Sequence, residues 1–238
     1  MPEDFHEWEY LANSRTPEAY NKIVKGNADI IFVAQPSGGQ KKRAEESGVT
    51  LIYTPFAREA FVFIVNVDNP VNSLTEQQVR DIFSGAITNW RTFGGNDQEI
   101  QTWQRPEDSG SQTVMQSQVM KNVRMISPQE TEVASGREGL IKVVAEYRNT
   151  NNAIGYTFRY YATQMNADKN IKLLAINGIT PTAENIRNGK YAYIVDAFMV
   201  TRENKTSETQ KLVEWFLTPQ GQSLVEDVGY VPLYPTME

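Results

Sequence analysis

Apolar positions along this chain follow two different periods in turn. Residues 28–34, ADIIFVA, form a nearly continuous apolar run, which is typical of a strand buried on both faces. The segment before it, PEAYNKIVKG at 17–26, instead spaces Tyr20, Ile23 and Val24 along one face of a helix. It starts with a proline, which suits a first helical turn, and ends with a glycine. We therefore expect a short helix that leads into a buried strand.

The alternation of helical and extended patterns continues to the end of the chain. Capped or amphipathic patterns at 40–48, 74–85, 139–149 and 207–218 predict helices, and β-branched or aromatic runs at 50–55, 59–67, 153–158, 171–178 and 196–201 predict strands. Strands that alternate with helices indicate an α/β protein with mainly parallel sheets covered by helices. The sequence shows no fixed-period repeat and no low-complexity linker.

Composition and charge narrow the range of partners. The chain has 238 residues, of which 40% are hydrophobic, enough for one large domain or two lobes with a real core. Its net charge of -6 argues against a nucleic-acid partner, because such binding needs a cationic surface that displaces counterions from phosphates. Any anion that binds must therefore be held by a local group of donors.

Cysteine and histidine usage excludes several kinds of site. The chain has no cysteine and a single histidine, His6, which removes thiol chemistry, cysteine-based zinc sites and any histidine-dependent triad beyond that residue. We expect no functional role for His6, and no metal ion or cofactor. No apolar run is long enough to cross a membrane, and the first ten residues lack the pattern of a signal peptide. We expect no transmembrane segment in this chain.

Residues 105–113, RPEDSGSQT, gather small hydrogen-bond donors where a short strand gives way to a helix. The first backbone N–H groups of a helix lack intrahelical partners and carry partial positive charge, so they favour an oxyanion. Gly110 allows close approach to the backbone, and the hydroxyls of Ser109 and Ser111 add neutral donors. Arg105 supplies a full charge on a planar fork. These residues suit a tetrahedral oxyanion, although an ordinary capped helix is compatible with the same composition.

The wider sequence around this segment resembles a known family. IFSGAITNW at 82–90, the glycine pair at 94 and 95 and then QRPEDSGSQT at 104–113 look like the paired signature of phosphate-binding proteins that feed ABC phosphate importers. The similarity extends over most of the chain. It implies a two-lobed clamshell of the periplasmic-binding-protein type that closes on a dehydrated anion. We expect one lobe to comprise 1–65 and 197–238, and the other 66–196.

The resemblance also assigns ligand-binding residues. The arginine and the serine-glycine-hydroxyl series of the family fall on Arg105, Ser109, Gly110 and Ser111, with serine in place of the usual threonine at the last position. A further family hydroxyl, at the start of the helix before the buried strand, falls on Thr16. Phosphate or a related inorganic oxyanion is the implied ligand.

Two departures from the family pattern bear on specificity. Where phosphate carriers place an aspartate that accepts the proton of hydrogenphosphate, this chain has Ala34, so discrimination against sulfate should relax. The first strand of the family and its hydroxyl-bearing loop have no counterpart in the first 14 residues. The chain is therefore expected either to be truncated at its N-terminus or to build its first lobe differently, without one wall of the cleft.

These observations predict a non-enzymatic, extracytoplasmic solute-binding protein that delivers its anion to the membrane subunits of an ABC transporter. The native protein would be held at the membrane by an anchor that this chain lacks. The alternative is a degenerate sensory or scaffold domain at the cell surface with little anion affinity. An enzyme is disfavoured, because the chain lacks a P-loop and a nucleophile paired with a base. Glu107 and Asp108 are expected in a solvated turn where they tune Arg105.

Overall fold

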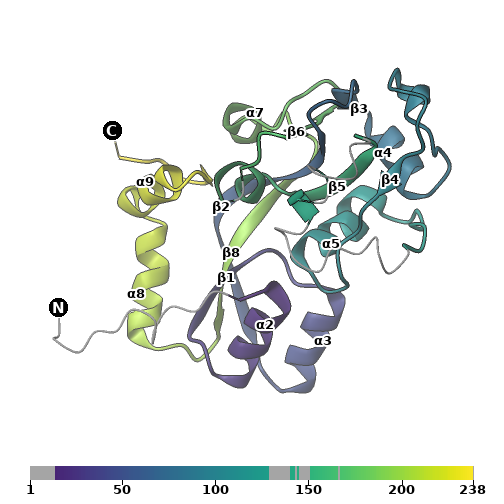
Figure 1. The fold of residues 1–238 in the computed structure, drawn as a ribbon. Coiled ribbons are helices and arrows are strands. Elements are labelled where there is room, and N and C mark those ends of the chain that lie inside the picture. The colour runs from purple at the N-terminus through teal and green to yellow at the C-terminus, as the bar shows by residue number, and fades with distance from the viewer. Residues whose placement is uncertain (1–13, 129–139, 143, 145–150, 166, 238) are drawn as a thin grey trace.

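The structure, a computed structural model, describes residues 14–128, 140–142, 144, 151–165 and 167–237 (Figure 1). Its helices are α2 (Thr16–Lys25), α3 (Gly38–Glu46), α4 (Glu76–Phe83), α5 (Gly110–Val114), α7 (Ala183–Arg187), α8 (Ser207–Phe216) and α9 (Pro219–Asp227), with the short segments η1 (Trp90–Phe93), η2 (Met115–Met120) and η5 (Tyr161–Met165). Its strands are β1 (Ile30–Val33), β2 (Leu51–Asn66), β3 (Ser73–Leu74), β4 (Gln101–Thr102), β5 (Ala153–Phe158), β6 (Ile171–Leu173), β7 (Ala175–Ile176), β8 (Ile194–Arg202) and β9 (Val231–Pro232). His6 and most of the helix expected at 139–149 lie outside the described residues.

The long strand β2 joins two groups of strands. Its first part pairs with β8, from Leu51 opposite Arg202 to Ala60 opposite Ile194, and β1 pairs with the other edge of β8. From Phe61 onward β2 pairs with β5 and β6, and β4 pairs with β5. The resulting order is β1-β8-β2-β5-β4.

The α/β class expected from the sequence is confirmed, and the strands run in mixed directions. β4–β5 and β3–β7 are parallel, whereas β8 is antiparallel to both β1 and β2. β1 and β2 therefore run in the same direction, as the intervening helix α3 predicts for a crossover unit. The sheet has more antiparallel pairs than expected, because β8, which comes from far along the chain, inserts between β1 and β2, and because β2 also runs antiparallel to β5, β6 and β9.

The hydrophobic core is also divided between the two groups of strands that β2 joins. The largest apolar cluster surrounds the second half of β2 and includes Phe61, Phe63, Trp90 and Tyr156. Smaller clusters lie between α2 and β1, and beneath α8 and α9. Trp90 and Trp103 are both buried and belong to the largest cluster.

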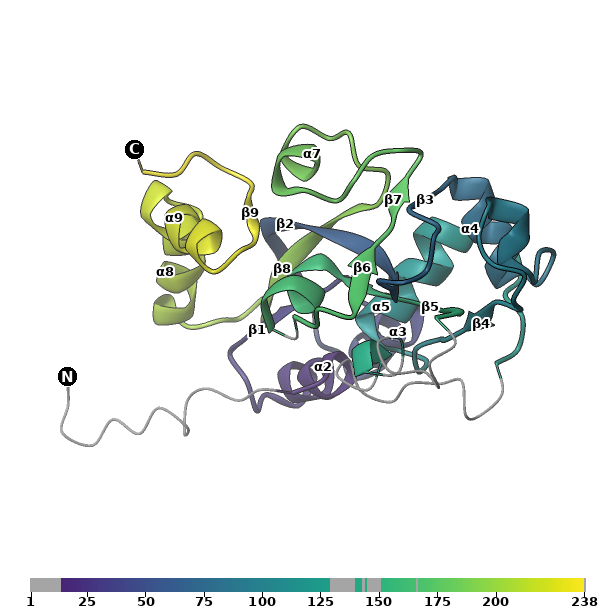
Figure 2. The same ribbon diagram turned by 45° about the horizontal axis from the view of Figure 1, so that its top comes forward.

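Two views of the ribbon place the helices relative to these strands. In Figures 1 and 2, α2 and α3 lie beside β1, and α8 and α9 flank the opposite side of β8. α4 and β4 lie at the end of the molecule remote from α8 and α9, and α5 lies between them and α3. The N-terminus of α5 is therefore directed at the region where α2, α3 and β1 meet.

Candidate functional site

α5 begins in the segment that is rich in small donors. Ser109 is its N-cap residue, and the Ser109 hydroxyl accepts a hydrogen bond from the backbone N–H of Gln112 (3.2 Å). The helix starts at Gly110 and continues from α5 directly into the π-helix η2. Ser111, the second helical residue, is only 4% exposed. The small donors thus stand at the positively polarised end of a helical segment, as expected from the sequence.

Gly110 brings three distant parts of the chain together. A Cβ atom built on Gly110 would lie 2.9 Å from the Cβ of Ala34, 3.4 Å from the Oγ1 of Thr16 and 3.5 Å from a ring carbon of Phe158. Ala34 follows β1, and Thr16 is the first residue of α2 and is 6% exposed. The close approach is possible because residue 110 has no side chain.

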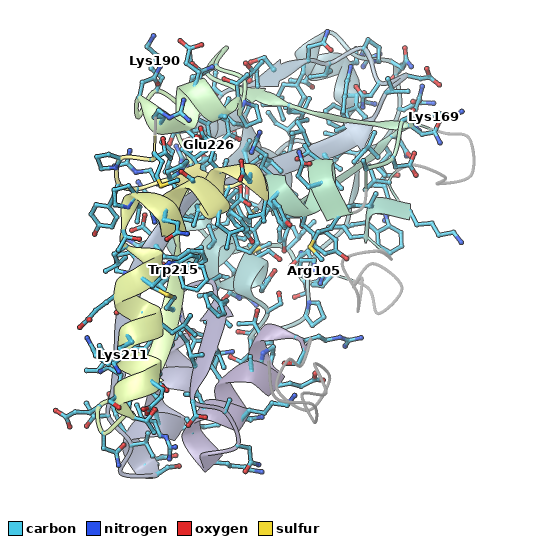
Figure 3. All side chains as sticks on the ribbon, turned by 90° about the vertical axis from the view of Figure 1, so that its left-hand side faces the viewer. Arg105, Lys169, Lys190, Lys211, Trp215 and Glu226 are labelled. Carbon is cyan, nitrogen blue, oxygen red and sulfur yellow. The ribbon has the colours of Figure 1, made fainter. Side chains whose placement is uncertain are left out.

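Arg105 lies in the connection between β4 and α5. Its backbone N–H donates to the hydroxyl of Tyr156 (3.1 Å), and that hydroxyl in turn donates to the Oε1 of Gln112. Burial raises the pKa of Tyr156, so the phenol stays protonated and can make both bonds. Arg105 is 7% exposed and lies near the middle of the molecule, whereas Lys169, Lys190 and Lys211 lie at its periphery (Figure 3).

Two cavities flank this region. One, of about 450 Å³, is lined by Arg105 together with Glu107, Gln112 and Gln116. The other, of about 100 Å³, is lined by Ala34 and by the buried carboxylate of Glu59. The structure therefore brings Thr16, Ala34 and Gly110 into one place and puts Arg105 in the wall of a different cavity from the one that Ala34 lines.

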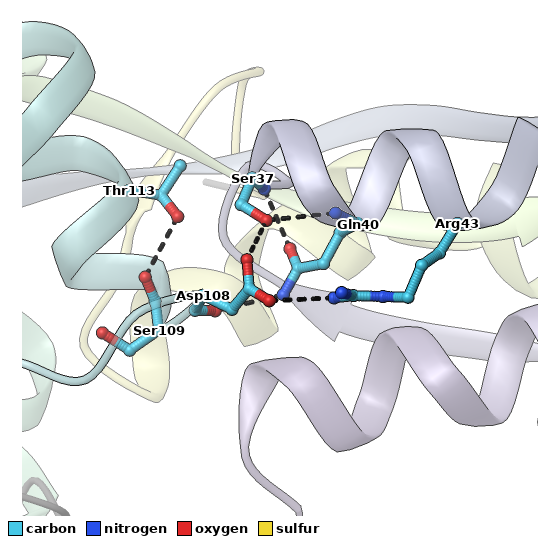
Figure 4. Close-up of polar contacts among 6 residues, drawn as sticks. All are labelled: Ser37, Gln40, Arg43, Asp108, Ser109 and Thr113. Atoms are coloured by element: carbon cyan, nitrogen blue, oxygen red, sulfur yellow. Dashed lines mark hydrogen bonds and ion pairs between the residues drawn. The ribbon is translucent and has the colours of Figure 1, made fainter.

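The sequence predicts that Glu107 and Asp108 lie in a solvated turn. Both lie in a turn and Glu107 is exposed, but Asp108 is held by a second segment of the chain. Its Oδ1 accepts a hydrogen bond from the Ser37 hydroxyl (2.5 Å), and its Oδ2 accepts one from Arg43 (3.0 Å) (Figure 4). Its backbone carbonyl accepts a third, from the side chain of Gln40 (3.1 Å). The bond from Ser37, followed by those from Arg43, holds the pKa of Asp108 below its usual range. The sequence does not reveal this pairing, because residues 37–43 are remote from Asp108 along the chain.

One local signal pointed to the partner segment. Ser37 caps α3 and Gln40 completes a capping box, a pattern that is readable in SGGQ at 37–40. Nothing local, however, pairs this helix start with a residue 71 positions later.

Other kinds of site receive no support within the part of the chain that the structure describes. In those residues, no group of three or more His, Cys, Asp or Glu side chains is arranged to hold a metal ion. None of the helices among them has the length and apolar content needed to cross a membrane.

Comparison with known proteins gives a consistent picture. The sequence model of the PBP superfamily domain matches residues 9–220. The phosphate-binding protein PstS of Bacillus subtilis (strain 168) is 27% identical over 209 residues, which cover 87% of this chain and 64% of that protein. PstS of Borreliella burgdorferi is 26% identical over 218 residues, which cover 89% of this chain and 74% of that protein. The chain thus spans about two thirds of the length of the B. subtilis relative.

Solved structures share the fold. A putative phosphate ABC transporter substrate-binding protein from Clostridium perfringens, with bound phosphate, superimposes with a TM-score of 0.75 at 25% identity and covers 91% of this chain and 84% of its own. An ABC-type phosphate transport receptor from Vibrio cholerae has a TM-score of 0.67 at 24% identity, with 91% and 84% covered. The second likeness concerns the fold alone.

Proposed function

This chain belongs to the family of the PBP superfamily domain, and we propose that it is a non-enzymatic solute-binding protein that captures phosphate or a related inorganic oxyanion. It would deliver the anion to the membrane subunits of an ABC transporter. The names of the PstS relatives and the phosphate bound in the C. perfringens structure support this proposal. A carrier that feeds an importer must meet its ligand outside the membrane, so the protein would act in an extracytoplasmic compartment.

One observation carries the proposal: Thr16 and Ala34 converge on Gly110 at the start of a helical segment. A hydroxyl, a glycine backbone and unpaired helical N–H groups are the donors that hold a dehydrated oxyanion. A buried site of this kind also explains how a chain with a net charge of -6 can retain an anion.

We assign the ligand contacts to five residues: Thr16, Arg105, Ser109, Gly110 and Ser111. Ser109 accepts a bond from Gln112, but its hydroxyl hydrogen remains available to donate to an anion. Gly110 and Ser111 would contribute backbone N–H groups. Arg105, whose backbone Tyr156 fixes in place, would contribute the positive charge from the wall of the neighbouring cavity.

Isothermal titration of the purified chain with phosphate and with sulfate tests the function. We expect saturable binding of both anions at one site, with modest discrimination between them, because hydroxyl and N–H donors serve both equally. Absence of heat with either anion, in protein that unfolds cooperatively, would contradict carrier function and favour a degenerate scaffold.

A further inference from the structure

The contacts of Asp108 connect two segments that are remote in sequence. The carboxylate bonds to Ser37 and Arg43, which precede it by 71 and 65 positions, and its carbonyl bonds to Gln40. We refer to these three interactions as the Asp108 contacts. Nearby, Gln35 donates to the hydroxyl of Ser117 (3.1 Å), so a second bond links the same two parts of the chain.

The first turn of α3 is well suited to receive this carboxylate. Ser37 is the N-cap residue, and the glycines at 38 and 39 leave the helix end open to close approach. A Cβ atom on Gly39 would lie 3.4 Å from the Oδ1 of Asp108. The partial positive charge at a helix N-terminus and the guanidinium of Arg43 both favour the ionised carboxylate. The Asp108 side chain is 27% exposed.

Asp108 also has an unusual backbone conformation, which its three contacts can hold in place. Its φ of 63° lies in the left-handed region, which residues other than glycine adopt at a cost, although aspartate tolerates it better than most. Asp108 immediately precedes Ser109, the N-cap of α5. A residue held in this way fixes the direction in which α5 begins.

We propose that Asp108 is a positioning residue whose contacts hold the N-terminus of α5 against Thr16 and Ala34. That the ligand is an oxyanion bound at Gly110 rests on the proposed function, whereas the placement of α5 relative to α3 does not. With the Asp108 contacts intact, the donors on α2 and α5 stand together before the anion arrives. Without them, part of the free energy of anion binding must be used to order the two segments, so the affinity for the anion falls.

The absence of cysteine from the sequence makes a direct distance measurement possible. Spin labels on Lys41→Cys in α3 and Asn122→Cys, just after η2, report the separation of the two segments through double electron–electron resonance. Both side chains are exposed. The distance is compared, without any anion, in the otherwise native protein, in Asp108→Asn and in Arg43→Gln. The matched control is Glu107→Gln, which neutralises the adjacent carboxylate.

Asp108→Asn keeps the size of the side chain and its tolerance of positive φ, but it removes the charge and replaces one acceptor oxygen with a donor NH2 group. We expect longer and broader distances in Asp108→Asn and in Arg43→Gln, and native distances in Glu107→Gln. Phosphate affinity should fall about tenfold in Asp108→Asn, within the usual range for coupled sites. The double variant Asp108→Asn/Arg43→Gln should be little worse than either single variant, because both remove one interaction.

Native distances in Asp108→Asn would overturn the proposal. So would a lowered melting temperature with unchanged phosphate affinity, because Asp108 would then be merely structural. If the native protein binds neither phosphate nor sulfate, the proposed function fails, and the distances alone decide whether Asp108 positions α5.

Discussion

At the scale of single residues, the absence of a side chain on Gly110 allows the start of α5 to approach Ala34 closely at the proposed site. Gly110→Ala places a Cβ atom 2.9 Å from that of Ala34, which cannot rotate away because it is attached to the backbone. We expect α5 to move outward, unfolding stability to fall by about 1–3 kcal/mol and anion affinity to fall with it. Thermal unfolding and calorimetric titration measure the two effects.

The structure supplies a matched control for that substitution. Gly38 is likewise the first residue of its helix, and a Cβ atom there would meet nothing within 4 Å. Gly38→Ala should therefore leave anion affinity unchanged. Equal losses of affinity in the two variants would show that crowding at Ala34 is not the cause.

Arg105→Ala should weaken anion binding far more than it weakens folding. A charge-assisted bond to an oxyanion contributes about 1.5–3 kcal/mol, so affinity should fall by roughly one to two orders of magnitude. Arg91→Ala is the control, because the Arg91 side chain is 72% exposed and pairs with Asp97 at the surface. Titration of both variants, alongside melting curves without anion, distinguishes the roles. A large loss of stability with little loss of affinity would make Arg105 structural.

Ala34→Asp should create discrimination between phosphate and sulfate. The new carboxylate would lie against Gly110, where it can accept the proton of hydrogenphosphate but must face a fully ionised sulfate oxygen. We expect sulfate affinity to collapse while phosphate affinity is retained. Ala34→Asn, of the same size but neutral, should show no such difference. If the native protein already strongly prefers phosphate, another acceptor must be present.

The sequence predicted some of these residues and missed others for a physical reason. Arg105, Ser109, Gly110 and Ser111 are close neighbours along the chain, so their residue types alone suggest an anion site. Their convergence with Ala34, and the pairing of Asp108 with α3, depend on tertiary packing across many tens of residues. Local patterns carry no information about such pairs.

At the scale of elements, β2 shows how a local rule can be overridden. Two separate runs rich in β-branched and aromatic residues, at 50–55 and 59–67, predict two strands, and Pro55 at the end of the first run lacks the N–H donor that a continuing strand would use. The structure has one strand, because the register against β8 shifts between Pro55 and Ala57 and accommodates Phe56 as an extra residue. A bulge of this kind lets one strand belong to both strand groups, which no local pattern could predict.

The link between α3 and the start of α5 should be sensitive to acid. The lowered pKa of Asp108 means that its stabilising effect is present above its unfolded pKa, near pH 4, and is lost as pH falls through the lower folded value. Urea unfolding without anion, measured from neutral to acidic pH, should show a smaller loss of stability in Asp108→Asn than in the native protein. Parallel curves in the two proteins would contradict this linkage.

At the scale of the whole molecule, the pairing of β2 bears on the expected lobes. We propose that 1–65 with 197–238 and 66–196 form two lobes, with β2 and β8 running between them. β2 changes partner from β8 to β5 at Phe61, close to the proposed boundary. The general fold followed from the helix and strand patterns, whereas this boundary rests on a family resemblance, because a continuous strand leaves no linker in the sequence.

If the two lobes close around an anion, the radius of gyration in solution should fall when phosphate is added. The Asp108 contacts already hold α3 and the start of α5 together without ligand, so the change should be small in the native protein. Asp108→Asn should begin more open and therefore contract more at saturating phosphate. Small-angle X-ray scattering with and without phosphate measures this, and Glu46→Gln, which neutralises an exposed carboxylate of α3, should behave like the native protein. Equal radii in all four measurements of the native protein and Asp108→Asn would show that the proposed lobes do not move as separate bodies.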